Sequence, residues 1–366
     1  MNYKKLLDDI VDKQKRNVKT IGVNFPYNDV DGEYCLVKRD AWTNGYWPGL
    51  LWISYLASGE IIFKETAELL EKELDENIKA FTLPAHDVGF VWLLSSGIHY
   101  KTDKNADSKR RLLQMSNYLA GRFNINGRYI RAWDSEDGND IVPGLAIIDC
   151  IMNIPLLFWA SEQTGDPRFS HIAKAHADTV AKYFIDDDGA VRHICRFDQD
   201  TGKFVKAIGG QGYSENSAWS RGAAWAIYGF SMAYEYTNDK NYLDISEKVS
   251  KFFVSQLNND FVPAWDFRAD NNSIKDSSAG AIAASGMIEL ARHTNNISYR
   301  EYAQRLVNGI YEHCSCFDHS RQAIVTKSTA NLPGNENIEA GLIYGDYYFA
   351  EAVLKLTDDK YSILWE

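Results

Sequence analysis

A short polar phrase recurs along this chain of 366 residues and constrains its fold more than any other feature. The phrase reads Thr-Gly-Asp-Pro from Thr164, and related versions begin at Thr237, Thr294 and Thr357, with looser ones at Thr102 and Ser58. Each copy ends one apolar run and supplies an Asp, Asn or Gly suited to cap the helix that follows. A recurring boundary of this kind indicates a repeat architecture.

The segments on the two sides of each phrase differ in kind. The preceding runs are rich in Gly, Ala and aromatic residues and almost free of charge: Gly49–Leu56, Val88–Tyr100, Leu145–Ser161, Ala218–Tyr236, Ala279–Ala291 and Ala340–Leu354. The other runs place apolar residues at helical spacing between Lys and Glu: Tyr3–Gln14, Ile61–Ile78, Ser108–Phe123, Phe169–Phe184, Tyr242–Leu257 and Tyr299–Tyr311. The first pattern predicts helices buried all round, and the second predicts amphipathic helices.

Buried and amphipathic helices that alternate in this way predict an all-α (α/α)6-barrel, in which six inner helices are wrapped by six outer ones. An open α-solenoid is the alternative, because ring closure leaves no mark in the sequence. No linker or low-complexity tract interrupts the repeat, so we expect residues 1–366 to form one domain.

Composition excludes several functions. The net charge of −11 and pI near 5.3 disfavour a nucleic-acid or anionic-membrane binder, which needs a basic surface. The longest apolar stretch, Val142 to Ala160, contains Asp149, Asn153 and Pro155, and therefore predicts a buried helix rather than a membrane span. Five cysteines without a Cys-x-x-Cys pair, and an acidic start in place of an export signal, favour a cytoplasmic location.

Long loops precede the predicted inner helices and would gather at one end of the barrel. They carry aromatic residues that suit a binding site, in the segments Pro26–Pro48, Asn124–Pro143, Asp186–Ser217, Phe261–Ser277 and Asp318–Glu339. Long loops on a rigid scaffold are where binding residues are expected.

Asp149 is the sharpest chemical signal. Its neighbours from Leu145 to Met152 are all apolar, which places a carboxyl near the start of a predicted buried helix. Burial raises the pKa of such a group and suits it to donate a proton. A structural carboxylate that bonds backbone amides or an Arg of another helix is the alternative.

Asp87 follows His86 and opens another predicted inner helix, at the same level as Asp149. Two carboxylates facing one cavity are the minimum for glycosidic chemistry. A helix cap is the plain alternative for Asp87. Arg221 and Trp225 lie four residues apart on one helical face, which pairs a cation with a stacking ring; Arg221 could equally neutralise Asp87 or Asp149.

Other motifs point to little chemistry. The run from His313 to His319 has metal-ligand residue types but no standard zinc spacing, so we expect no metal site. His171 and His176 lie on a charged outer helix and are expected at the surface. No phosphate-binding loop, dinucleotide glycine pattern or nucleophile elbow occurs, and no cofactor is predicted.

Several segments together resemble the bacterial unsaturated glucuronyl hydrolases, glycoside hydrolase family 88. They span nearly the whole chain in order: Trp42–Gly49, His86–Phe90, Arg131–Asp134, Ile148–Asn153, Gln211–Trp225 and Ile343–Tyr347. The resemblance implies a cytoplasmic (α/α)6-barrel enzyme without metal or cofactor. Its partner would be an anionic oligosaccharide that ends in a 4,5-unsaturated uronic acid, derived from glycosaminoglycans or related chains.

The resemblance also implies a mechanism, in which water adds across the C4=C5 double bond of the terminal sugar. Asp149 would donate the proton to C4 and then accept one from water, and Asp87 would hold substrate hydroxyls and keep Asp149 protonated. The substrate-binding residues implied by the matching motifs are Trp42, His86, Asn124, His193, Gln211, Trp219, Arg221 and Trp225.

One segment departs from part of the family. Members that prefer sulfated substrates carry a Ser- and Lys-bearing segment before the last inner helix, whereas the stretch Asn331–Glu336 has no cation. A preference for sulfated substrates is therefore not implied. Alternatives are an unsaturated rhamnogalacturonyl hydrolase, an inverting hydrolase, a sugar epimerase on the same barrel, and, from another class, a noncatalytic helical-repeat scaffold.

Overall fold

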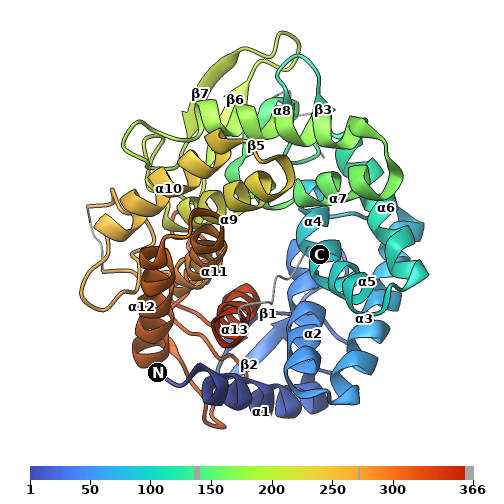
Figure 1. Ribbon diagram of the computed structural model, residues 1–366, viewed down its shortest axis with the longest axis vertical. Coiled ribbons are helices and arrows are strands. Elements are labelled where there is room, and N and C mark those ends of the chain that lie inside the picture. The colour runs from blue at the N-terminus through green and yellow to red at the C-terminus, as the bar shows by residue number, and fades with distance from the viewer. Residues whose placement is uncertain (136–140, 271–272, 359–366) are drawn as a thin grey trace.

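The computed structural model describes residues 1–135, 141–270 and 273–358. Helices dominate and form two concentric rings (Figure 1). The outer ring consists of α1 (Tyr3–Ile21), α3 (Ile61–Ala80), α6 (Ala106–Gly121), α8 (Pro167–Tyr183), α10 (Lys240–Ser255) and α12 (Ile297–Cys314). No helix in the described ranges combines the length and apolarity required to cross a bilayer.

The inner ring contains four continuous segments and two interrupted ones. The continuous helices are α2 (Tyr46–Ser58), α9 (Ser220–Thr237), α11 (Ser277–Thr294) and α13 (Ile343–Thr357). One interrupted segment joins α4 (Val88–Trp92), a π-helical turn (Leu93–Gly97) and α5 (Ile98–Asp103); the other joins a 3-10 helix, η5 (Ile148–Met152), and α7 (Pro155–Thr164).

The ring of helices is closed, a point that the sequence alone could not decide. The last inner helix, α13, packs against the first, α2, and the outer helix α1 covers the seam between them. The structure is therefore the predicted (α/α)6-barrel and not an open solenoid. Inner helices are buried on every face: each residue of α9 from Ser220 to Ala233, and each of α11 from Ser277 to Leu290, is buried.

The repeated phrase makes each inner-to-outer turn. Gly165 and Asn238 take left-handed backbone conformations that end α7 and α9, with φ of 71° and 52°. The next residues, Asp166 and Asp239, cap α8 and α10 by accepting hydrogen bonds from backbone N–H groups two positions on, at 2.9 and 3.1 Å. The phrase thus satisfies helix-end groups that would otherwise lack partners.

All strands lie in the loops that precede inner segments. Two antiparallel pairs are β1–β2 (Pro26–Val30, Glu33–Leu36) and β3–β4 (Phe123–Asn124, Tyr129–Ile130). A three-stranded antiparallel sheet has the order β5–β6–β7 (Leu145–Ile147, Ile194–Phe197, Phe204–Ile208). Short 3-10 turns complete these loops: η1 (Trp42–Gly45), η2 (Ala85–Asp87) and η4 (Val142–Gly144).

The β5 strand corrects the predicted helix over Leu145–Ser161. Leu145, Ala146 and Ile147 pair with Arg196, Cys195 and Ile194 of β6, and α-helix begins only at Pro155. A short apolar run is compatible with either a strand or a buried helix, and here the distant β6 strand decides.

Candidate active site

The predicted site residues come from the starts of different inner segments. His86 and Asp87 lie on η2, Asp149 on η5, and Trp219 and Arg221 at the beginning of α9. Trp42 opens η1, His193 immediately precedes β6, and Gln211 follows β7. Because the barrel brings these starts to one end, residues far apart in sequence become neighbours.

Asp149 is positioned by the sheet rather than by a helix. The backbone N–H of Ile148 donates to the carbonyl of His193 at 3.0 Å, which continues the β5–β6 pairing by one residue. This contact brings the imidazole of His193 beside the carboxyl, with 3.7 Å between His193 Nε2 and Asp149 Oδ2. Two loops separated by more than forty residues therefore form one wall of the site.

The Asp149 carboxyl is nearly buried, with its side chain 14% exposed. Its Oδ2 atom has no hydrogen-bond donor among the described residues. Burial raises the pKa of Asp149 to about 6, although the nearby charge of Arg221 acts to lower it. A carboxyl with this pKa is protonated in about one molecule in ten at pH 7, far more often than an ordinary Asp, which suits it to act as a general acid.

His193 is a neutral donor. The backbone N–H of Gln211 donates to His193 Nδ1 at 2.8 Å, so that Nδ1 is unprotonated and the ring proton lies on Nε2, facing Asp149. Burial lowers the pKa of His193 to about 3, and the charge of Arg221 acts in the same direction. The imidazole therefore keeps this form across the neutral range.

Asp87 is the second carboxyl of the site. Burial, and then the negative charge of Asp149, raise its pKa well above the usual range, while Arg122 acts to lower it. Nε2 of His86 lies 3.4 Å from Asp87 Oδ1, and both ring nitrogens of the fully buried His86 lack hydrogen-bond partners in the described residues. Burial also lowers the pKa of His86 well below its usual range.

Asp87 occupies the N-cap position of α4, as the plain alternative proposed, but its side chain does not cap the helix. Its side chain makes no cap hydrogen bond to α4; instead Asn153 Oδ1 accepts from the backbone N–H of Phe90 at 2.8 Å. Asn153 Nδ2 also donates to the carbonyl of Asp149 at 3.3 Å and so ties the two carboxyl-bearing segments together. A Cβ on Gly89 would lie 2.5 Å from Asn153 Oδ1, which explains the glycine beside Asp87.

Arg221 has a different counterion from those considered. It pairs with the fully buried Asp276 at 2.5 Å, and not with Asp87 or Asp149. Its ring partner also differs, because the guanidinium carbon lies 4.6 Å from the ring centroid of Trp219, whereas Trp225 packs against Phe90 at 5.0 Å. The i, i+4 spacing of Arg221 and Trp225 therefore did not predict which ring contacts the guanidinium.

Asp276 is a residue that the sequence analysis missed. A charged residue directly before an apolar inner helix was the available signal, the same signal that marked Asp87. Asn153, a polar residue inside a long apolar run, gave a comparable hint.

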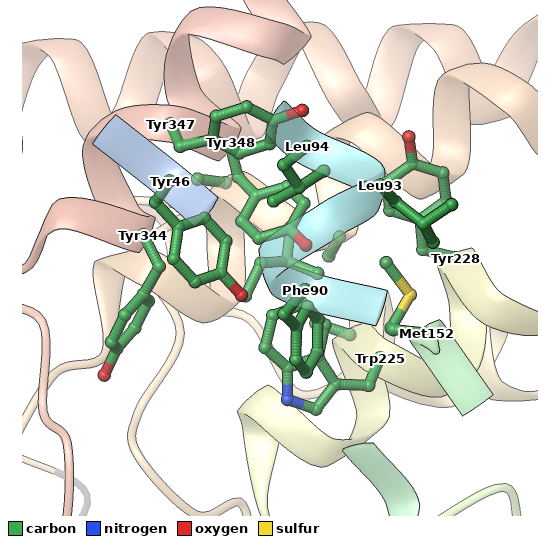
Figure 2. Packing of buried hydrophobic residues seen from close by; sticks show 14 of the residues in the cluster. Tyr46, Phe90, Leu93, Leu94, Met152, Trp225, Tyr228, Tyr344, Tyr347 and Tyr348 are labelled. Carbon is green, nitrogen blue, oxygen red and sulfur yellow. The ribbon is translucent and has the colours of Figure 1, made fainter. Parts of the chain in front are cut away.

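Aromatic side chains line the site beneath these polar groups. The ring of Trp42 lies 5.7 Å from Phe90 and 5.3 Å from Tyr344, between centroids. Trp219 contacts the His193 ring at 4.4 Å. Figure 2 shows Trp225, Phe90, Tyr46 and Tyr344 on one side of the packed aromatic cluster. Flat rings of this kind suit the faces of a sugar.

The side chain of Asn124 is engaged by two hairpin turns. It accepts from the backbone N–H of Gly127 at 2.7 Å and donates to the carbonyl of Gln199 at 2.8 Å. These bonds close the β3–β4 turn and join it to the turn between β6 and β7. The substrate contact of Asn124 stays a prediction.

His176 also differs from its prediction. It is fully buried on α8, and its Nδ1 accepts from the backbone N–H of Ile130 at 3.1 Å. A helix rich in charged residues can therefore carry a buried histidine, and here that histidine accepts a hydrogen bond from the β4 strand.

Metal-ligand types converge at one place among the described residues, away from the site. Glu68, His99 and Asp103 lie close enough to share an ion, but the ammonium of Lys64 already donates to Asp103. The run from His313 to His319 does not form such a group within the described ranges. Among the described residues, no set of this kind includes Asp149.

Fold and site together define a helical-barrel glycoside hydrolase. The model of Glycosyl Hydrolase Family 88 matches residues 13–351, and the chain belongs to this family.

Three relatives illustrate the similarity. The chain is 35% identical to an unsaturated glucuronyl hydrolase of Formosa agariphila, with 87% of this chain and 80% of the relative covered. It is 30% identical to the unsaturated glucuronyl hydrolase of Bacillus sp. (strain GL1), with 97% and 96% covered. The solved structure of the Bacillus enzyme, described as responsible for glycosaminoglycan degradation, covers 98% of this chain and 97% of its own at a TM-score of 0.93.

A solved Streptococcus agalactiae unsaturated glucuronyl hydrolase variant, complexed with dGlcA-GalNAc6S, has a TM-score of 0.85 and 25% identity. That comparison covers all of this chain and 92% of the other.

Proposed function

We propose that this chain is an unsaturated glucuronyl hydrolase. It would act on oligosaccharides that end in a 4,5-unsaturated uronic acid, of glycosaminoglycan or related origin, and release a 4-deoxy-5-keto uronic acid. The observation that carries the proposal is the nearly buried Asp149 carboxyl, whose pKa of about 6 suits a proton donor and which faces a neutral histidine.

The substrate is an enol ether, since its ring oxygen is attached to the C5 end of the double bond. Asp149 transfers its proton to C4, and positive charge develops at C5 and the ring oxygen. Water adds to C5 and returns a proton to the Asp149 carboxylate. The hemiketal then opens by breaking the bond between C5 and the ring oxygen, and the hemiacetal left at C1 collapses and expels the neighbouring sugar.

The surrounding residues have separate tasks in this scheme. Asp87, whose pKa is raised well above the usual range by burial, binds substrate hydroxyls. The Nε2–H of His193 donates to an oxygen near Asp149. Trp42, Trp219 and Trp225 stack on the sugar, and Gln211, whose Oε1 accepts from Arg221 at 2.6 Å, presents its amide N–H groups.

The loop beside Arg221 favours unsulfated substrates. Ala330, whose carbonyl accepts from Arg221 at 2.5 Å, leads into the turn Asn331–Glu336, closed by paired backbone hydrogen bonds between Asn331 and Glu336. The turn contains one carboxylate and no cation, so a sulfate nearby would find no counter-charge.

The deciding experiment follows the near-ultraviolet absorbance of an unsaturated, unsulfated chondroitin or hyaluronan disaccharide after addition of the protein. Hydration of the double bond destroys the conjugated chromophore, so absorbance should fall. Asp149→Asn should reduce the rate at least about 1000-fold, because it removes the proton donor. Asp239→Asn is the matched control: it makes the same chemical change at an exposed helix cap, where Asn serves equally well.

Other results would favour other functions. Loss of absorbance only with pectin-derived substrates would indicate a rhamnogalacturonyl hydrolase. Cleavage of saturated glucuronides would indicate an inverting hydrolase. Unchanged absorbance with every unsaturated substrate would contradict the proposal and favour an epimerase or a noncatalytic scaffold.

A further inference from the structure

Tyr344, at the start of α13, has a hydroxyl without a partner. Its side chain is fully buried, yet the hydroxyl makes no hydrogen bond in the described part of the chain. A buried polar atom left in this state destabilises the protein, so that such atoms commonly mark a place where a ligand or water completes the bond. In Figure 2 the Tyr344 hydroxyl points away from the packed aromatic cluster, on the side opposite that of Tyr228.

The surroundings of Tyr344 place this hydroxyl at the active site. Its ring lies 5.3 Å from the Trp42 ring, and the guanidinium carbon of Arg221 lies 5.5 Å from its centroid. Burial raises the pKa of Tyr344 well above the usual range, the charge of Arg221 acts to lower it, and the charges of Asp276 and Asp149 act to raise it further. The hydroxyl is therefore a neutral donor at working pH, within electrostatic reach of the proposed acid.

Most donors of Arg221 are already engaged. Its Nη1 donates to Asp276 and to the Thr329 carbonyl at 2.5 and 2.6 Å. Its Nη2 donates to Gln211 and to the Ala330 carbonyl at 2.6 and 2.5 Å. Four of the five N–H groups of the guanidinium thus face protein acceptors in the described ranges, and only the Nε–H is left for a ligand. Because a carboxylate has two oxygens and accepts several hydrogen bonds, a further donor beside Arg221 has an acceptor to serve.

We propose that the Tyr344 hydroxyl is a substrate-binding donor that holds the carboxylate of the unsaturated uronic acid. The assignment rests on the proposed function and adds one residue to it. An anionic oxygen is the acceptor that best matches a buried neutral O–H beside a fixed positive charge. Because the carboxylate is present both in the bound substrate and in the transition state, the contact affects binding more than the chemical step.

The test uses Tyr344→Phe, which removes the hydroxyl and keeps the ring. Binding of the unsaturated disaccharide is measured by calorimetry in two proteins, Asp149→Asn and the double variant Asp149→Asn with Tyr344→Phe, so that no turnover intervenes. We expect the second change to weaken binding about 10- to 100-fold. In the active enzyme, the same change should raise KM by a similar factor and alter kcat less than about threefold.

Two comparisons isolate the carboxylate and the fold. With the methyl ester of the disaccharide, Tyr344→Phe should lose less than about threefold, because the charged acceptor is gone. Tyr228→Phe is the matched control in the same cluster: its hydroxyl bonds Glu351 and Lys355, so this change should lower the melting temperature and leave binding unchanged.

Binding unaffected by Tyr344→Phe would overturn the assignment, and so would an equal loss with acid and ester. A fall in kcat at constant KM would also overturn it, since the hydroxyl would then act in the chemistry. If the disaccharide binds as expected and the wild-type chain never consumes it, the proposed function fails while the assignment of Tyr344 stands.

Discussion

Two clusters of ionisable groups are buried in the inner ring, and they are built in opposite ways. The lysine network comprises Tyr228, Ser285, Glu289, Glu351 and Lys355, on α9, α11 and α13. Lys355 is fully buried and lies 2.6 Å from Glu289 and 3.5 Å from Glu351, which accepts from Tyr228 and Ser285 at 2.7 Å each. Arg292 lies 2.8 Å from Glu289, so that two cations face the two carboxylates, and the hydrogen bonds are made within the protein.

At the active-site end this matching is missing. Asp149 Oδ2, both nitrogens of His86 and the Tyr344 hydroxyl have no hydrogen-bond partner in the described residues. The side chains of the two clusters are buried to a similar degree. Burial alone therefore does not distinguish a cluster that stabilises the fold from one that binds a ligand. The difference lies in what is left unsatisfied, because a site keeps donors and acceptors for its ligand.

The largest expected effect is a loss of stability on removing the lysine from the lysine network. Lys355→Met leaves Glu351 buried without a cation and Glu289 with Arg292 alone, and should lower the free energy of unfolding by about 3–5 kcal/mol. Urea denaturation measures the loss. Activity per folded molecule should stay within about twofold of wild type, and a larger change would show that the two clusters are coupled.

The pH dependence tests the unmatched cluster. The active form of Asp149 is protonated and its pKa is about 6, so kcat/KM should be level at lower pH and fall about tenfold per unit well above 6. His193 has a pKa of about 3 and does not titrate in this range. Initial rates between pH 5 and 8.5 give the profile, and a rate that rises through this interval would exclude Asp149 as the acid.

Asp149→Asn should stabilise the fold while it abolishes activity. The folded pKa of about 6 exceeds the unfolded value of about 3.9, so the native state binds protons more tightly. Wild-type stability therefore declines as pH rises from about 4 to 6, and the variant escapes this loss. We expect a gain of about 1–3 kcal/mol at pH 8 and almost none at pH 4. An equal gain at both pH values would exclude the carboxylate charge as its cause.

The smallest effect concerns the loop beside Arg221. Glu336→Lys puts a cation in an exposed turn, where screened charges are worth about 0.2–1 kcal/mol. The ratio of kcat/KM for a sulfated over an unsulfated disaccharide should rise about two- to fivefold at low salt. Glu336→Gln should give roughly half of that change in free energy, and an unchanged ratio for both would place the turn away from the sulfate.

Much of the fold could be predicted from local pattern. The alternation of apolar and amphipathic runs, and the capping chemistry of residues such as Asp166 and Asp239, identified both rings and most boundaries. Closure could not be predicted, because it depends on α13 meeting α2. The β5 strand was missed for a related reason, since its partner Ile194 lies 47 positions from Ile147.

The site was predictable only in part. Asp149 and Asp87 could be found in the sequence because each is a charged residue beside apolar ones. The hydrogen-bond and ion-pair partners of a side chain depend on the folded structure and could not be predicted in this way. Arg221 pairs with Asp276, 55 positions away, a carboxylate that the sequence analysis did not consider. The hydrogen bonds of the Asn124 side chain to two hairpin turns could not be predicted either. His176 was assigned to the surface because its helix is charged, yet the β4 strand covers it.

The bond that sets the protonation of His193 has an evolutionary consequence. Its donor is the main chain of residue 211, which every amino acid except proline provides. The protonation of the imidazole therefore does not depend on the Gln211 side chain, which has its own role beside Arg221. Selection for the correct histidine form should act on the path of the loop, and Gln211→Pro should disturb the imidazole where Gln211→Ala would leave it unchanged.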